Sequence, residues 1–216
     1  MAYRSITRCL VVLITLLFIT SCAAQGRLYN LCFTKHPQYT QYEYVAYDSF
    51  ENPRNCTRYP DLWHQEFPVQ VVAPVSAFND VRDMAMDIND AVGKDLLIVR
   101  MRLPHETLIA PDDDAVVWVI VSDDLVSLCK KNGGKPCLAY TQYWFKNGKY
   151  YSTIVLYDNK MKTSEQRRSV VKHELLHALG LQHSKESLFD AMYSKFYPST
   201  KPRRISQEDL KVLREL

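Results

Sequence analysis

The chain has 216 residues, of which 47% are hydrophobic and 24% are charged, and its formal net charge is +3. This size and composition are typical of one globular domain with a short extension, and they exclude a largely disordered chain. Two of the 27 basic residues, Arg4 and Arg8, lie at the extreme N-terminus, so the remainder nearly balances the 24 acidic residues. The charge therefore gives no case for a nucleic-acid partner.

The first residues have the pattern of an export signal. Arg4 and Arg8 precede an apolar run, Leu10 to Ile19, and small residues follow it. The run is too short to cross a bilayer, which takes about 20 apolar residues. We therefore expect a signal peptide at residues 1–24 and an exported protein.

Two ways of processing this signal peptide remain open. Ile19-Thr20-Ser21-Cys22 resembles a bacterial lipobox, in which Cys22 is lipidated and becomes the new N-terminus of a cell-envelope lipoprotein. Cleavage near Ala24 would instead release a secreted protein. The position of the cysteine favours the lipoprotein, and a lipid anchor would be the only membrane attachment that we expect.

Four cysteines remain beyond the leader: Cys32, Cys56, Cys129 and Cys137. An even number in an exported chain indicates two disulfides. Cys129–Cys137 is favoured because the segment between them contains Gly133-Gly134 and would form a compact closed loop. Cys32–Cys56 would then staple the N-terminal region, and unpaired buried thiols are the alternative.

Residues 25–65 are rich in tyrosine and proline, and we interpret them as an extension that lies over the domain at residues 66–216. A short extended piece is expected at most, around Tyr42 and Tyr44. The domain begins with a β-branched strand, Val69 to Val72. Ser76 can cap the following helix, Phe78 to Val92, which Gly93 would end.

The other face of that helix carries Asp80, Asp83, Asp87 and Asp90, which we interpret as a solvated face.

Leu96 to Met101 is expected to be a strand, and the apolar run Ala115 to Val121 a strand buried on both faces. Asp112 to Asp114 could hold Ca²⁺, although they lack the spacing of a known calcium loop.

Two aromatic, β-prone runs, Tyr140 to Phe145 and Tyr150 to Tyr157, flank Asn147-Gly148 and predict a hairpin. Thr163 and Gln166 match a capping box, so a helix is expected from there to Leu179.

The C-terminal residues predict a further helix. Ile205, Ser206, Asp209 and Leu210 resemble a hydrophobic staple around an N-cap. Together the elements indicate an α+β fold, a mixed twisted sheet with helices packed on it.

The stretch from His173 to His183 reads HExxHxxGxxH. His173 and His177 are four residues apart on the expected helix, so they lie on one face, where two ring nitrogens can meet one metal ion. Glu174 flanks that face, where a general base for the water that the metal binds belongs.

The third histidine, His183, reaches the same metal only if the helix stops and the chain turns back. Gly180 supplies that turn, because glycine adopts the left-handed conformation without a Cβ clash. The whole spacing predicts one Zn²⁺ site with ligands His173, His177 and His183.

On these residues the chain resembles the metzincin clan of zinc endopeptidases. Met192 lies where that clan has its methionine turn, and Ser184, Met192-Tyr193 and the run Ile205 to Leu210 are most similar to the matrixin branch. The resemblance implies a zincin-like domain with a twisted mixed five-stranded sheet, an active-site helix and a C-terminal helix.

The resemblance also implies the chemistry: a zinc endopeptidase in which Glu174 is the catalytic base, acting on protein or peptide substrates. Substrate would bind as an extra strand along an edge of the sheet, for which the candidates are Tyr140, Thr141 and Gln142. A monomer is expected.

The chain departs from matrixins at Pro53-Arg54-Asn55-Cys56, which carries an extra residue and lacks the glycine of the prodomain cysteine switch. The remaining histidines do not form the second, structural zinc site of animal matrixins. The alternative function is a non-catalytic, envelope-anchored peptide-binding protein on the same fold, which would have lost the glutamate or a ligand.

Overall fold

The computed structural model describes residues 32–35, 43–45, 57–58, 67–104, 117–122, 138–146, 149–181, 183, 189–193 and 203–216. The elements in chain order are β1 (Cys32–Lys35), β2 (Glu43–Val45), β3 (Thr57–Arg58), β4 (Val69–Ala73), α2 (Phe78–Val92), β5 (Leu97–Met101), β6 (Val117–Val121), β7 (Ala139–Lys146), β8 (Lys149–Leu156), the 3-10 turn η2 (Asp158–Lys160), α4 (Ser164–Ala178) and α5 (Gln207–Glu215). The helices and strands expected from residue 69 onward are confirmed.

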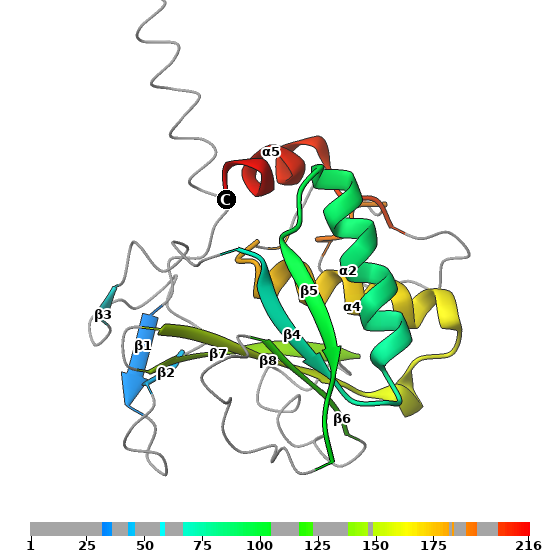
Figure 1. The fold of residues 1–216 in the computed structure, drawn as a ribbon, viewed down its shortest axis with the longest axis horizontal. Helices are drawn as coiled ribbons and strands as arrows, with labels where there is room; N and C mark the ends of the chain where they lie inside the picture. The colour runs from blue at the N-terminus through cyan, green and yellow to red at the C-terminus, as the bar shows by residue number, and fades with distance from the viewer. Residues whose placement is uncertain are drawn as a thin grey trace, which may run out of the picture.

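The five expected strands are consecutive in the sheet, in the order β7-β8-β6-β4-β5. β4 is parallel to β5 and β6, β6 is parallel to β8, and β7 is antiparallel to β8, so the sheet is mixed. It twists strongly from β7 to β5 (Figure 1). The predicted mixed five-stranded sheet is therefore confirmed.

Three short N-terminal strands continue this sheet beyond β7, in the order β3-β1-β2, so the whole sheet has eight strands. β2 pairs with the C-terminal part of β7, where Glu43 lies opposite Phe145 and Tyr44 opposite Trp144. The β7–β8 register closes at Lys146 and Lys149, as the Asn-Gly turn predicts.

The main core lies between one face of the sheet and the helices α2 and α4. Alternate strand residues point into it, among them Val69 and Val71 of β4, and Val117 and Val119 of β6. They meet apolar side chains at helical spacing on α2 and α4, including Ile88 and Leu175.

Side chains on the opposite face of the sheet pack separately. Val72 and Trp118 form a cluster there, and Val155 and Tyr157 form another. β6 is buried on both faces at its first three residues, as expected, whereas Ile120 and Val121 are partly buried. No helix among the described residues is long and apolar enough to span a membrane.

One expectation about α2 was wrong, and another holds only in part. Its N-cap is Ala77 and no side chain caps it, because a turn from Pro74 to Ala77 already starts the helix. The carbonyl of Ser76 instead accepts a hydrogen bond from Arg167 of α4, at 2.8 Å.

The acidic face of α2 is also not simply solvated. Asp80, Asp83 and Asp87 form ion pairs with Arg167, Arg168 and Lys172 of α4 respectively. The sequence shows the acidic stripe but not that a basic helix packs beside it.

Candidate active site

The helix α4 begins and ends at the residues that the sequence marks. Thr163 caps it, its side chain accepting from the N–H of Gln166 at 3.1 Å. The Gln166 side chain accepts in return from the N–H of Lys162 at 2.8 Å. The first bond satisfies an amide group that the first helical turn leaves without a partner, and the second fixes the residue before the cap.

The C-terminus of α4 is a Schellman turn around Gly180, which has a φ of 97°. The N–H of Gly180 donates to His177 O at 2.7 Å, and the N–H of Leu181 donates to Leu176 O at 3.0 Å. The turn reverses the chain immediately after the second histidine, and this reversal lets His183 approach the helix.

The three histidines come together as the spacing predicts. The Nε2 atom of His183 lies 3.2 Å from Nε2 of His173 and 3.1 Å from Nε2 of His177. The ligand atoms of all three lie within 4.8 Å of one another. His173 and His177 are buried, whereas His183 is exposed and forms the outer side of the cluster.

The backbone fixes the tautomer of the two helical histidines. His173 Nδ1 lies 2.6 Å from Ala191 O, and His177 Nδ1 lies 2.7 Å from Leu181 O. A carbonyl only accepts, so each Nδ1 carries the proton and each Nε2 presents its lone pair to the cluster. Burial lowers the pKa of His173 to about 3, with a further contribution from His183, so the ring is neutral.

The cluster fits a bound zinc ion. Three Zn–N bonds of about 2.05 Å at tetrahedral angles separate the nitrogens by about 3.3 Å, close to the distances above. One proton on His183 could bridge only one of its two contacts, whereas one cation can be shared by all three lone pairs. The second ring nitrogen of each helical histidine is held by a carbonyl, as is usual for zinc ligands.

Glu174 lies beside this cluster and is buried. Its Oε2 lies 2.7 Å from the hydroxyl oxygen of Thr141 on β7, and the same hydroxyl oxygen lies 3.1 Å from Glu174 O. Burial raises the pKa of Glu174 to about 7, and the Thr141 hydroxyl opposes this rise. A carboxyl group with such a pKa can take up and release a proton near neutral pH.

The strand β7 holds α4 through a second hydroxyl. Tyr143 lies two residues after Thr141, on the same face of the strand, and its OH donates to His177 O at 2.8 Å. β7 thus contacts both the glutamate and the backbone of a histidine. The residues expected at the substrate edge, Tyr140, Thr141 and Gln142, lie in the N-terminal half of β7, whereas β2 borders the C-terminal half. Thr141 faces the helix.

Met192 is fully buried in the main core, and the turn that carries it is tightly bonded. Its N–H donates to Asp190 Oδ1 at 2.9 Å, and the N–H of Tyr193 donates to Asp190 O at 3.2 Å. Arg203, also buried, donates to Tyr193 O at 3.1 Å. The turn that carries Met192 is thereby joined to the chain segment that returns before α5.

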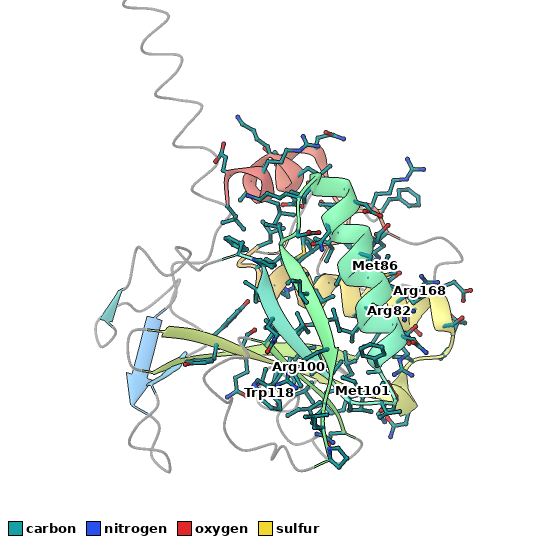
Figure 2. All side chains as sticks on the ribbon, in the orientation of Figure 1. Arg82, Met86, Arg100, Met101, Trp118 and Arg168 are labelled. Carbon is teal, nitrogen blue, oxygen red and sulfur yellow. The ribbon has the colours of Figure 1, made fainter. Side chains whose placement is uncertain are left out.

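Ion pairs join α2 to α4, the helix that carries His173 and His177. Figure 2 shows Arg82 of α2 and Arg168 of α4 on the same side of the molecule, and both pair with Asp83. Next to His173, the buried Lys172 pairs with Asp87 and donates to Arg203 O at 3.2 Å. Ion pairs with α2, in addition to packing in the core, therefore hold α4 in place.

Several expected features lie outside the described residues. These are the leader with Cys22, the cysteines Cys56, Cys129 and Cys137, and the acidic turn Asp112 to Asp114; for Cys32 the strand is described but the side chain is not. The sequence reasoning missed the roles of Thr141, Tyr143, Asp190 and Arg203. The one signal in the sequence was that Thr141 and Tyr143, both with hydroxyl groups, occupy alternate positions of the same strand; nothing marked Asp190 or Arg203.

The comparisons with known proteins agree with this geometry. The matrixin family profile matches residues 106–216, which is a longer stretch than the motif and C-terminal helix alone. A search of curated proteins returned no match for this chain. The matched region contains the three histidines, Glu174 and Met192. The chain therefore belongs to the matrixin family and is a zinc metalloendopeptidase.

Proposed function

We propose that the protein cleaves peptide bonds outside the cytoplasm, with His173, His177 and His183 as the zinc ligands and Glu174 as the general base. The observation that carries this assignment is the convergence of the three Nε2 atoms beside a buried carboxyl group. The alternative of a non-catalytic peptide-binding protein has no support, because no ligand is missing and the glutamate is present.

The chemistry divides between the metal and the glutamate. A zinc ion held by His173, His177 and His183 would lower the pKa of a water to about 7 and polarise the scissile carbonyl. Glu174 takes the proton of the attacking water and passes it to the leaving amine. In the metal-free protein burial raises the pKa of Glu174 to about 7, and the positive charge of a bound zinc ion would oppose that rise.

Burial of the site supports this division of roles. His173 and Glu174 are both shielded from solvent, so charge that develops on the carbonyl oxygen is weakly screened there. The neutral state of His173 keeps its Nε2 lone pair available at neutral pH. Met192 would pack beneath the ligands without bonding to the metal.

The test compares the zinc-loaded protein with Glu174→Gln and His183→Ala on casein and on a peptide library. Both substitutions should abolish cleavage, but Glu174→Gln should bind one equivalent of zinc whereas His183→Ala should bind it weakly. Equal cleavage by wild type and Glu174→Gln would remove Glu174 from the mechanism. Failure of the zinc-loaded wild type to cleave any peptide would count against the proposed peptidase activity.

The proposed substrate site is the N-terminal half of β7, at Tyr140, Thr141 and Gln142. The closeness of Thr141 to Glu174 supports it, since a peptide along this strand would run past the catalytic groups. β2, which pairs at Trp144 and Phe145, borders this stretch at one end. Cleavage-site profiling of a peptide library would test the assignment.

The remaining assignments concern the ends of the chain. Matrixins are typically extracellular. We propose a signal peptide at residues 1–24, an extension at 25–65 and a catalytic domain at 66–216, with lipidation at Cys22 and disulfides Cys129–Cys137 and Cys32–Cys56. Intact mass spectrometry of the mature protein would detect the lipid, peptide mapping without reduction would identify the cysteine pairs, and the native mass would test the expected monomer.

A further inference from the structure

We propose that Thr141 is a positioning residue for catalysis: its hydroxyl holds one oxygen of the Glu174 carboxylate, so that the other oxygen faces the reacting water. This inference rests on the proposed role of Glu174 and identifies the group that orients it.

The contact distances assign the hydroxyl proton. Thr141 Oγ1 lies 2.7 Å from Glu174 Oε2 and 3.1 Å from Glu174 O. A hydroxyl has one proton to donate, and hydrogen bonds from hydroxyls to carboxylates are the shorter kind. Thr141 therefore donates to Oε2. Both residues are buried, with exposed fractions of 1% and 4%, so bulk water does not compete for the bond.

The threonine is the fixed partner of the pair. It lies in the middle of β7, opposite Ile154 of β8, in a ladder that runs the full length of the hairpin. Its β-branched side chain has little freedom about χ1. Glu174 extends from α4 on three rotatable bonds, so its carboxylate is the adjustable partner. The hydrogen bond leaves Oε1 as the oxygen that exchanges the proton.

A purely structural role for Thr141 predicts a different behaviour. β7 is also attached to α4 through Tyr143, whose OH donates to His177 O at 2.8 Å. If Thr141 only fastened the strand to the helix, loss of either hydroxyl would have a similar effect. If Thr141 orients the base, only the loss of the Thr141 hydroxyl should lower kcat per bound zinc.

The experiment therefore uses Thr141→Val, Thr141→Ser and the matched control Tyr143→Phe in the full chain loaded with zinc. Thr141→Val keeps the shape and should lower kcat by about ten- to a hundredfold, with KM changed by less than about twofold. Thr141→Ser, which restores the hydroxyl, should keep most of the wild-type kcat, whereas any loss in Tyr143→Phe should match its loss of bound zinc, because Tyr143 bonds the backbone of a zinc ligand. Zinc content and melting temperature of each variant show whether it is folded. Wild-type kcat in Thr141→Val, or an equal loss of kcat per bound zinc in Tyr143→Phe, would overturn the proposal.

A second measurement does not depend on activity. In protein labelled with ¹³C at glutamate carboxyl groups, Thr141→Val should shift one carboxylate band in the infrared difference spectrum, because that group loses a donor. The shift should vanish when both proteins also carry Glu174→Gln; a band that persists would overturn the proposal. An inactive Glu174→Gln beside a fully active Thr141→Val defeats only this inference, an active Glu174→Gln removes Glu174 from the mechanism, and a zinc-loaded wild type that cleaves no peptide defeats the proposed function itself.

Discussion

His173 Nδ1 lies 2.6 Å from the carbonyl oxygen of Ala191, the residue immediately before Met192. The turn that carries Met192 therefore orients a zinc ligand as well as forming part of the core. Because the ring donates to this carbonyl, any change that moves the turn rotates the ligand. Asp190 is the residue that holds the turn, through the N–H of Met192 and its charge next to Arg203.

The first prediction is that Asp190→Ala weakens zinc binding by about ten- to a hundredfold, the usual effect of losing a group that supports a metal ligand. Competition with a chromophoric chelator measures the affinity. Asp90→Ala, an exposed substitution on α2, is the control and should leave the affinity unchanged. Wild-type zinc affinity in a folded Asp190→Ala protein would show that the turn does not orient His173.

The chain reveals the metal ligands so clearly because their geometry is local. The positions of His173, His177, Gly180 and His183 depend on one helix and one turn, and both follow from sequence spacing. Thr163 likewise marks the start of that helix and does cap it. Elements whose signals lie within about ten residues were thus predicted correctly.

Contacts between distant segments could not be predicted in the same way. Thr141 meets Glu174 only because the hairpin packs on α4, and Asp87 meets Lys172 only because two helices lie side by side. Ser76 failed as a cap because the preceding turn had already positioned Ala77. For Thr141 and Asp87 tertiary packing chose between several partners that the local sequence allowed, whereas Ser76 failed for a local reason.

The second prediction concerns the pH dependence of the zinc-free protein. The pKa of His173 is about 3 in the fold against an ordinary value of 6.5, so between these values the unfolded chain binds a proton that the fold does not. Stability is therefore lost as pH falls below 6.5, by up to about 1.4 kcal/mol per pH unit for such a histidine. The pKa of His177 is lowered for the same reason, burial, and adds to the loss.

The ionisation of Glu174 changes the stability of the fold with pH in the opposite direction. Its pKa is about 7 in the fold against an ordinary value of 4.5, so the fold holds a proton that the unfolded chain releases between these values, and acidification stabilises the fold. Urea unfolding from pH 4 to 7.5 should show a steeper acid loss in Glu174→Gln than in wild type. Parallel profiles for the two proteins would contradict the raised pKa.

The third prediction compares two ion pairs between α2 and α4. Lys172 is buried, with 6% of its side chain exposed, whereas Arg168, the partner of Asp83, is 46% exposed. Asp87→Asn leaves a buried ammonium without its carboxylate and should lower the free energy of unfolding by about 1 kcal/mol, a modest value because Asp87 itself is half exposed. Asp83→Asn should cost less than about 0.5 kcal/mol. Chemical denaturation of both variants measures the difference, and equal costs would refute it.

The fourth prediction separates the two glycines with positive φ, Gly180 at 97° and Gly93 at 85°. Alanine at either position takes on the left-handed strain, about 1 to 2 kcal/mol, and a Cβ at Gly93 meets no atom within 4 Å. Gly93→Ala, at an exposed position, should therefore lose about this amount of stability, and Gly180→Ala, at a buried position, should lose at least as much. Only Gly180→Ala should also weaken zinc binding, because the turn at Gly180 brings His183 to the helix and directs Leu181 O to His177. Melting temperatures and zinc affinities of the two variants provide the comparison. If Gly93→Ala weakened zinc binding as much as Gly180→Ala, the effect would reflect general destabilisation and not the position of the third ligand.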